Sequence, residues 1–175
     1  MYRVSNVVAA VVLATTVASA GPAAAMPMEV PASAAKGAVH AKPAGASAPG
    51  SEIKSVALSQ VGVPYSYGGT TPAGFDCSGF TSWVYSHVGV TLPHSSSAQY
   101  SLGGSGGFTT IAAISDLEIG DLVFHSTGGS GVGHAGIYVG DGQFISATSS
   151  EGVQVRSLSD SYWRPLWVGA VRYSR

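Results

Sequence analysis

Cys77 is the residue best suited to covalent chemistry in this chain of 175 residues, because it is the only thiol. It lies in the segment GFDCSGFTSW, where the apolar pattern predicts a helix with Asp76 as its N-cap. The positive end of a helix and its unpaired N–H groups favour the thiolate of a cysteine in the first turn, whereas the Asp76 carboxylate opposes it. We therefore predict a nucleophilic cysteine; the alternatives are a small buried residue and an intermolecular disulfide bridge.

A cysteine nucleophile needs a base, and the chain has five histidines. His40 lies in a linker-like segment and His87 lies inside the predicted helix that contains Cys77, so both are poor candidates. His94 and His125 stay open. The fifth, His134, begins the run HAGIYVGDGQF, a predicted strand whose start can face the N-terminus of that helix. Cys77 and His134 are therefore the predicted catalytic pair.

The chain divides into three segments by composition. Residues 1–25 have the early charge, short apolar run and small cleavage-site residues of a secretory signal peptide, and the run is too short to span a bilayer. Residues 26–50 are rich in Ala, Pro, Gly and Ser, which predicts a disordered linker. Residues 51–175 suffice for one compact domain. We expect an exported, monomeric protein with no transmembrane segment.

The domain begins with helical patterns and continues with β-rich runs. Apolar residues recur at helical spacing after Ser51, the predicted cap of the first helix, and LPHSSSAQYSL predicts a short third helix. GGSGGFTT reads as a glycine-rich loop. Five runs are predicted strands: residues 121–125, 134–139, 143–148, 153–156 and 166–173. This order predicts an α+β domain with its helices packed on an antiparallel sheet of about five to six strands.

Charge and composition exclude several classes of function. The net charge is −1, and acidic residues outnumber basic ones after residue 50, which argues against nucleic-acid binding. One cysteine with scattered histidines does not make a metal site, and no phosphate-binding loop is present, so we expect no cofactor. Gly103–Gly107 matches the G-x-S-x-G pattern of serine hydrolases, but its flanks read as loop.

Several segments together resemble the NlpC/P60 family of bacterial cell-wall cysteine peptidases. They are GVPYSYGGTTPAGFDCSGF, LPHSSSAQ, GDLVF, HAGIYVGDGQFISA and the late YW, in the family's order and spacing. The resemblance covers nearly the whole domain and implies a papain-like fold, a secreted protein associated with the cell wall, and peptidoglycan stem peptides as substrate. The implied bond joins the γ-carboxyl of D-glutamate to the diamino acid. An N-acyl amidase of the same fold and a non-catalytic wall-binding module are the alternatives.

The resemblance also implies roles for individual residues. It makes Cys77 the nucleophile and His134 the general base. Tyr65 resembles a tyrosine that family members place near the thiol and the oxyanion, although a packing role is the alternative. Asp76 and Ser78 resemble residues that bind a free amino group of the stem peptide in some members, and each is equally well explained as part of a helix cap.

The third catalytic position departs from the family pattern. Family members often have a histidine twelve residues after the base, where it orients the imidazole, and this chain has Ser146 there. Only residues on the same face of the sheet as His134 can take that role. Ser146 is the predicted orienting residue, and Thr148 is the reserve candidate.

The turn after the histidine strand decides which face this serine occupies. A two-residue turn at 141–142 would place it on the opposite face from the histidine. A three-residue loop at 140–142 places it on the same face, as a diagonal neighbour about 7–8 Å away. We predict the three-residue loop, in which Val139 pairs with Gln143.

Overall fold

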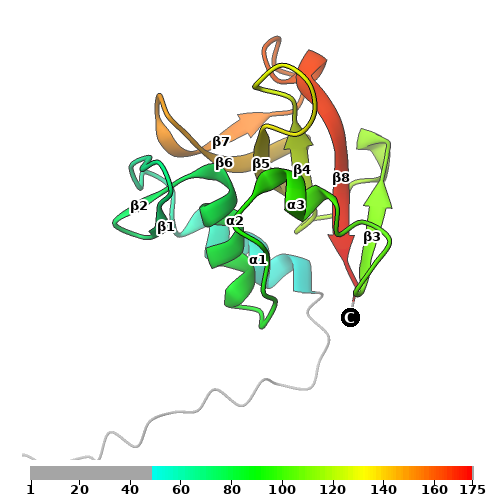
Figure 1. Ribbon diagram of the computed structural model, residues 1–175, viewed down its shortest axis with the longest axis horizontal. Helices are drawn as coiled ribbons and strands as arrows, with labels where there is room; N and C mark the ends of the chain where they lie inside the picture. The colour runs from blue at the N-terminus through cyan, green and yellow to red at the C-terminus, as the bar shows by residue number, and fades with distance from the viewer. Residues whose placement is uncertain (1–48, 175) are drawn as a thin grey trace, which may run out of the picture. The chain divides into compact units, whose positions relative to one another are not determined.

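The computed structural model describes residues 49–174, which form an α+β domain (Figure 1). The predicted signal peptide and nearly all of the predicted linker lie outside the described residues. Helix α1 (Pro49–Leu58) begins inside the segment predicted as linker, so Ser51 lies within the helix and the prediction that it is the N-cap is wrong. Proline suits the first helical position because its missing N–H would have no partner there.

The other two helices begin at capping residues. Helix α2 (Cys77–Ser86) has Asp76 as its N-cap, whose Oδ1 accepts a hydrogen bond of 2.6 Å from the Gly79 N–H, as predicted. Helix α3 (Ser96–Tyr100) has Ser95 as its N-cap. No helix among residues 49–174 is long and apolar enough to cross a membrane.

Six antiparallel strands form the main sheet in the order β3-β8-β4-β5-β6-β7. They are β3 (Phe108–Ile111), β4 (Leu122–His125), β5 (His134–Gly140), β6 (Gln143–Thr148), β7 (Gly152–Ser157) and β8 (Trp167–Tyr173). A small hairpin, β1 (Thr70–Thr71) with β2 (Gly74–Phe75), and two 3₁₀ turns, η1 (Ile114–Asp116) and η2 (Arg164–Leu166), complete the described elements. All five predicted strands are present.

Strand β3 begins inside the segment predicted as a glycine-rich loop, so that prediction is wrong for its last three residues, 108–110. The strand forms through pairing with β8, in which Phe108 lies opposite Tyr173. Its partner is distant in the chain, and a short edge strand carries little local signal of its own.

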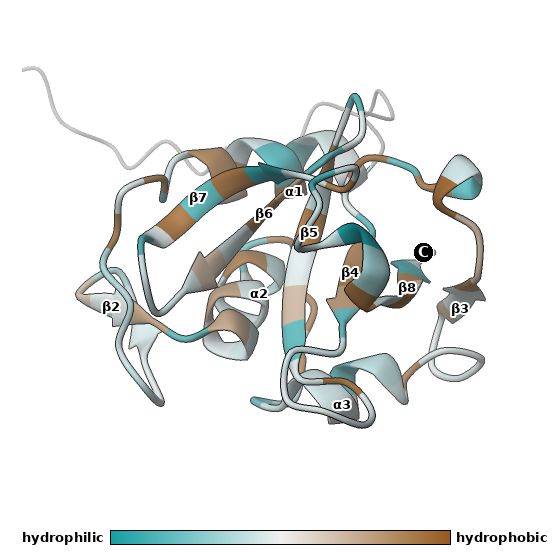
Figure 2. Cartoon of the chain, turned by 90° about the horizontal axis from the view of Figure 1, so that it is seen from above, coloured by the Kyte–Doolittle hydropathy of each residue, from teal (hydrophilic) through white to brown (hydrophobic). Residues whose placement is uncertain are grey.

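Different parts of the chain pack against the two faces of the sheet. The helices contact one face, where Ala135, Ile137 and Val139 of β5 belong to the main hydrophobic core. A second cluster lies on the other face, beneath the segment that carries Trp163. Hydrophobic and hydrophilic bands alternate along β7 in Figure 2, as expected for a strand with different environments on its two faces.

The hairpin of β5 and β6 corrects the predicted loop. Gly140 pairs with Gln143, and Asp141 and Gly142 have φ of 53° and 69°, so the turn has two residues and the three-residue prediction is wrong. Two positive φ values identify a type I′ turn, which matches the right-handed twist of paired strands.

A bulge nevertheless restores the predicted register. The pairing shifts between Tyr138 and Gly140, and before that point Ile137 pairs with Ile145. One extra residue in a strand has the same effect on register as one extra residue in the loop. Ser146 therefore lies opposite Gly136, and a Cβ added to that glycine would come within 3.2 Å of the serine Cβ. This places Ser146 on the same face as His134.

Candidate active site

A cleft of about 420 Å³ brings Cys77, His134 and Tyr65 together. The three come from the start of α2, the start of β5 and the segment before β1. The end of β6, the residues between β6 and β7, part of β7 and the segment after it supply further lining residues, which include Thr148, Glu151, Arg156, Asp160, Tyr162 and Trp163. The predicted nucleophile and base thus share one solvent-accessible space.

Cys77 lies directly against the first residues of β5. The backbone N–H of Ala135, the residue after His134, is within hydrogen-bonding reach of the cysteine sulfur and favours the thiolate. Burial has the larger effect and raises the pKa of the Cys77 thiol, and the Asp76 carboxylate raises it further. The backbone N–H groups favour the thiolate and Asp76 opposes it, as predicted, but desolvation outweighs the N–H groups and the pKa of Cys77 is raised in the free protein.

His134 is a buried, neutral imidazole. Its ring packs on the indole of Trp163 with 4.9 Å between ring centroids, and its Nε2 atom is buried without a hydrogen-bond partner in residues 49–174. Burial, with smaller effects from His125 and from the charge of Arg156, lowers the pKa of His134 from 6.5 to about 3. A neutral imidazole beside a protonated thiol is the state in which a general base can accept the thiol proton.

The position of Tyr65 is compatible with both roles considered for it, and its role near the oxyanion stays a prediction. It packs against the main core and also lines the cleft. Burial, the nearby Cys77 and Asp76 all raise the pKa of its phenol, so the hydroxyl remains a hydrogen-bond donor at neutral pH.

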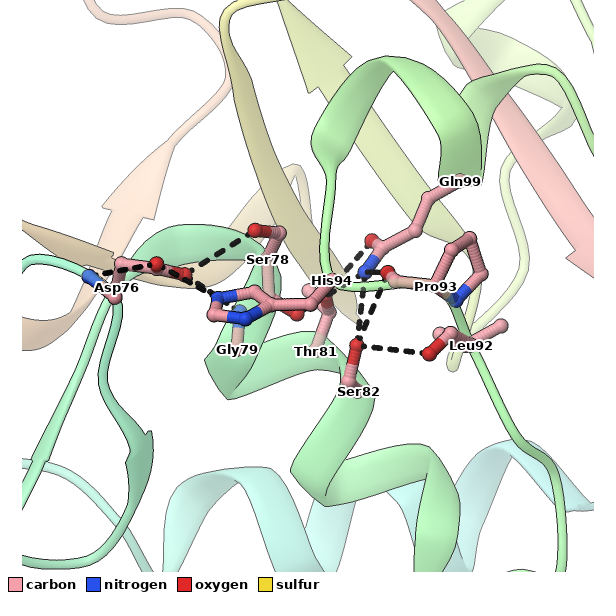
Figure 3. Close-up of polar contacts among 10 residues, drawn as sticks. Asp76, Ser78, Gly79, Thr81, Ser82, Leu92, Pro93, His94 and Gln99 are labelled. Carbon is pink, nitrogen blue, oxygen red and sulfur yellow. Dashed lines mark hydrogen bonds and ion pairs between the residues drawn. The ribbon is translucent and has the colours of Figure 1, made fainter.

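Asp76 and Ser78 are engaged in the start of α2 (Figure 3). Asp76 Oδ1 accepts hydrogen bonds from Gly79 N–H and Ser78 Oγ, and Oδ2 lies 2.7 Å from His94 Nε2 and accepts from Gly68 N–H. Neither Asp76 nor Ser78 is among the residues that line the cleft. The helix-cap alternative accounts for these contacts, and substrate binding by the two residues stays a prediction.

Gln99, which sequence reasoning did not single out, connects this helix start to the segment before α3 (Figure 3). Its side chain is fully buried, accepts from Thr81 Oγ1 at 2.8 Å, and donates to the carbonyls of Ser78 and Pro93 at 3.0 and 2.8 Å. Ser82 adds a further contact to Gln99 Nε2 at 3.1 Å. The buried amide therefore fixes the backbone immediately after Cys77.

Ser146, the predicted orienting residue, makes no hydrogen bond to His134, the predicted base. Ser146 is fully buried on the same face as His134, but its Oγ has no hydrogen-bond partner in the described chain. Thr148 lines the cleft and contacts Ser150 Oγ at 3.5 Å. His125, which sequence reasoning left open, is also buried and lies directly opposite His134 on β4. The sequence carries no signal for this pairing, because it depends on which strands are neighbours.

Within residues 49–174, no three His, Cys, Asp or Glu side chains gather as a metal ion would require. The chemistry available at the cleft is that of a thiol, an imidazole, a phenol and backbone N–H groups.

Comparison with known proteins identifies the family. A sequence model described as the NlpC/P60 family matches residues 62–172. The chain belongs to the NlpC/P60 family. It is 42% identical over 123 residues to the probable peptidoglycan endopeptidase LytE of Bacillus subtilis (strain 168), a match that covers 70% of this chain and 34% of LytE. It is 45% identical over 113 residues to the probable endopeptidase p60 of Listeria seeligeri, covering 65% of this chain and 20% of p60. The chain thus spans about a third or less of these NlpC/P60 relatives.

Solved structures confirm the NlpC/P60 fold. The crystal structure of the NlpC/p60 domain of the peptidoglycan hydrolase SagA matches with a TM-score of 0.59 and 38% identity, and covers 70% of this chain and 97% of that one. An NlpC/P60 family protein from Bacillus cereus matches with a TM-score of 0.65 and 30% identity, over 72% of this chain and 40% of that one. The predicted α+β architecture of helices on an antiparallel sheet is confirmed.

Gln99→Leu is expected to lower the free energy of unfolding by about 2–3 kcal/mol, because it leaves buried carbonyl groups without a donor. Urea unfolding followed by circular dichroism measures the change. Gln143→Leu, at an exposed glutamine, is the matched control and should change stability by less than about 0.5 kcal/mol. Equal effects of the two substitutions would contradict the role assigned to Gln99.

Acidification is expected to destabilise the domain through its two buried histidines. Below pH 6.5 the unfolded chain binds protons, whereas burial lowers the pKa of His125 to about 4 and that of His134 to about 3 in the folded state. Each histidine therefore contributes a slope of about 1.4 kcal/mol per pH unit between roughly pH 6 and 4, with stability lost as pH falls. His125→Phe should remove one such contribution, and His87→Phe, at an exposed histidine, should leave the slope unchanged.

Proposed function

We propose that this protein is a cysteine endopeptidase that hydrolyses peptide bonds in the stem peptides of peptidoglycan. The observation that carries the proposal is the cleft in which Cys77, at the start of α2, meets His134, at the start of β5, with the Ala135 N–H at the sulfur. Membership of the NlpC/P60 family and the relatives named as peptidoglycan endopeptidases or hydrolases support the same substrate.

The proposed reaction uses the neutral thiol and imidazole of the resting cleft. His134 takes the proton of Cys77 as the sulfur attacks the scissile carbonyl carbon, and the Cys77 N–H and the Tyr65 hydroxyl donate to the oxyanion. Collapse of this intermediate breaks the peptide bond, and the leaving amine takes the proton from His134. Water then attacks the thioester, His134 accepts its proton, and the thiol returns with release of the carboxylic acid.

The proposed bond joins the γ-carboxyl of D-glutamate to the diamino acid. One relative, 38% identical over 138 residues, is the gamma-DL-glutamyl hydrolase of Bacillus subtilis (strain 168), covering 77% of this chain and 31% of that protein. Such a substrate lies in the cell wall, so we propose that the protein acts outside the cytoplasmic membrane, in keeping with the signal peptide expected in residues 1–25.

Arg156 is the side chain we propose to bind a substrate carboxylate. It lines the cleft, and Glu151 is the only hydrogen-bond partner of its guanidinium among the described residues. Arg172, by contrast, forms four hydrogen bonds with Asp121, Glu118 and the Asp116 carbonyl, as expected for a structural arginine. A glutamate linked through its γ-carboxyl keeps its α-carboxylate free beside the scissile bond, and a guanidinium matches that group in charge and shape.

Cys77→Ala is expected to abolish the release of fragments from purified sacculi and from stem peptides, because Cys77 is the only thiol of the chain. Mass spectrometry of the digest identifies the new termini, and termini at D-glutamate and the diamino acid support the proposed bond. His134→Ala should have the same effect, whereas His87→Ala, which alters an exposed histidine at the end of α2, should leave cleavage unchanged.

Release of intact stem peptides from the glycan would instead identify an amidase, and binding without cleavage by the wild-type protein would identify a wall-binding module.

Arg156→Gln is expected to raise the KM for stem peptides with a free α-carboxylate about 10-fold or more, with a smaller change in kcat, because a charge-assisted hydrogen bond contributes about 1.5–3 kcal/mol. Steady-state kinetics on matched free and amidated peptides measure this effect, which should be weaker with the amidated peptide. Arg164→Gln is the control, since Arg164 lies on the exposed 3₁₀ turn η2 and does not line this cleft. An equal loss on both peptides would contradict carboxylate recognition.

A further inference from the structure

Two buried polar side chains, His125 and Ser146, lie on the same face of the sheet as His134 and next to it. His125 of β4 pairs directly with His134 of β5, and Ser146 of β6 lies opposite Gly136 and so is a diagonal neighbour of His134. Their exposed fractions are 0% for His125, 7% for His134 and 0% for Ser146. Together these residues form what we call the histidine–serine cluster.

The histidine–serine cluster contains four buried atoms without a hydrogen-bond partner in the described chain: His125 Nδ1, His125 Nε2, His134 Nε2 and Ser146 Oγ. Each such group costs about 1–3 kcal/mol when it is left without a partner, and native proteins contain few of them. The side chains packed around His125 include the aromatic rings of Phe144, Trp163 and Trp167. Residues 49–174 therefore offer these atoms no conventional hydrogen-bond partner.

The spacing suits a bridging molecule better than a direct contact. The ring centroids of His125 and His134 are 6.4 Å apart, which is too far for a hydrogen bond between the two rings. Polar groups separated beyond about 3.5 Å are commonly bridged by water, and a buried water typically makes about three hydrogen bonds to such groups. The cluster presents three side chains for that purpose.

We propose that the histidine–serine cluster binds one buried water that orients His134 in place of a third catalytic side chain. The water accepts a hydrogen bond from His134 Nε2–H and donates to Ser146 Oγ and to one ring nitrogen of His125. The ring of His125 makes T-shaped contacts with the indoles of Trp163 and Trp167, so its second nitrogen donates an N–H···π contact to the face of one of them. His125 and Ser146 are thus positioning residues, which act on the reaction only through His134.

This arrangement fixes the tautomer that the proposed mechanism needs. A proton held on Nε2 leaves the lone pair on Nδ1, so Nδ1 is the nitrogen that accepts the Cys77 proton. Arg156 of β7, which lies opposite Phe144, carries a positive charge that disfavours protonation of the His134 imidazole. The expected effect on kcat rests on the proposed function, whereas the water site itself does not.

The test combines substitutions of the two positioning residues. His125→Phe and Ser146→Ala should each lower kcat on a stem peptide about 10-fold to 100-fold with little change in KM, as is typical when an orienting partner is lost. The double variant should have a kcat little lower than that of either single variant, because both substitutions remove the same water.

Ser146→His places an imidazole in the space of the water and should keep or raise activity. In that background His125→Phe should change kcat less than about twofold.

Two further variants separate positioning from packing. His125→Gln keeps a hydrogen-bonding group at this position and should recover part of the activity lost in His125→Phe, and His87→Phe is the matched control for an exposed histidine. If His125 only fills the core, His125→Phe would leave kcat unchanged, or would lower kcat by the same factor in the Ser146→His background as in the wild-type protein. Either result overturns the proposal.

A spectroscopic measurement keeps the water site distinguishable from the enzymatic function. In ¹⁵N NMR of the wild-type protein, His134 should show a single neutral tautomer with its proton on Nε2 and slow exchange of that proton. His125→Phe and Ser146→Ala should each give mixed tautomers or fast exchange. An inactive wild-type protein with this signature would refute the proposed function alone, whereas mixed tautomers in the wild-type protein would refute the water site.

Discussion

The contact between the start of α2 and the start of β5 is the constraint on which the rest of the site depends. The Ala135 N–H within reach of the Cys77 sulfur joins two segments that are far apart in the sequence, and Cys77 and His134 line the same cleft. The supporting structure on each side holds this contact in place. Asp76 and Gln99 fix the helix start, and pairing with β4 and β6 fixes the strand.

Close packing at the helix start explains why glycine follows the DCS sequence. A Cβ on Gly79 would lie 2.0 Å from the Gly69 carbonyl oxygen, so only glycine allows that segment to approach the first turn of α2. The same approach lets the Asp76 N–H donate to the Gly69 carbonyl at 3.0 Å. The residues around the nucleophile thus serve backbone packing as well as chemistry.

Burial controls the charge state of the site. Desolvation raises the pKa of Cys77 and lowers that of His134, so both groups are neutral in the resting cleft. Helix N–H groups favour the thiolate, but they act on a sulfur that has lost most of its contact with water. The same burial leaves the far side of the His134 ring among aromatic side chains, where each polar atom needs a specific partner.

The sequence by itself determined the features that depend on neighbouring residues. The cap at Asp76, the cysteine in the first turn of α2, the five β-rich runs and the motifs of the NlpC/P60 family all follow from short-range patterns. Only the tertiary structure decided which strands pair, how the bulge before Gly140 sets the face of Ser146, and that His125 lies opposite His134. It also decided the direction of the cysteine pKa, because desolvation depends on packing between segments that are distant in the chain.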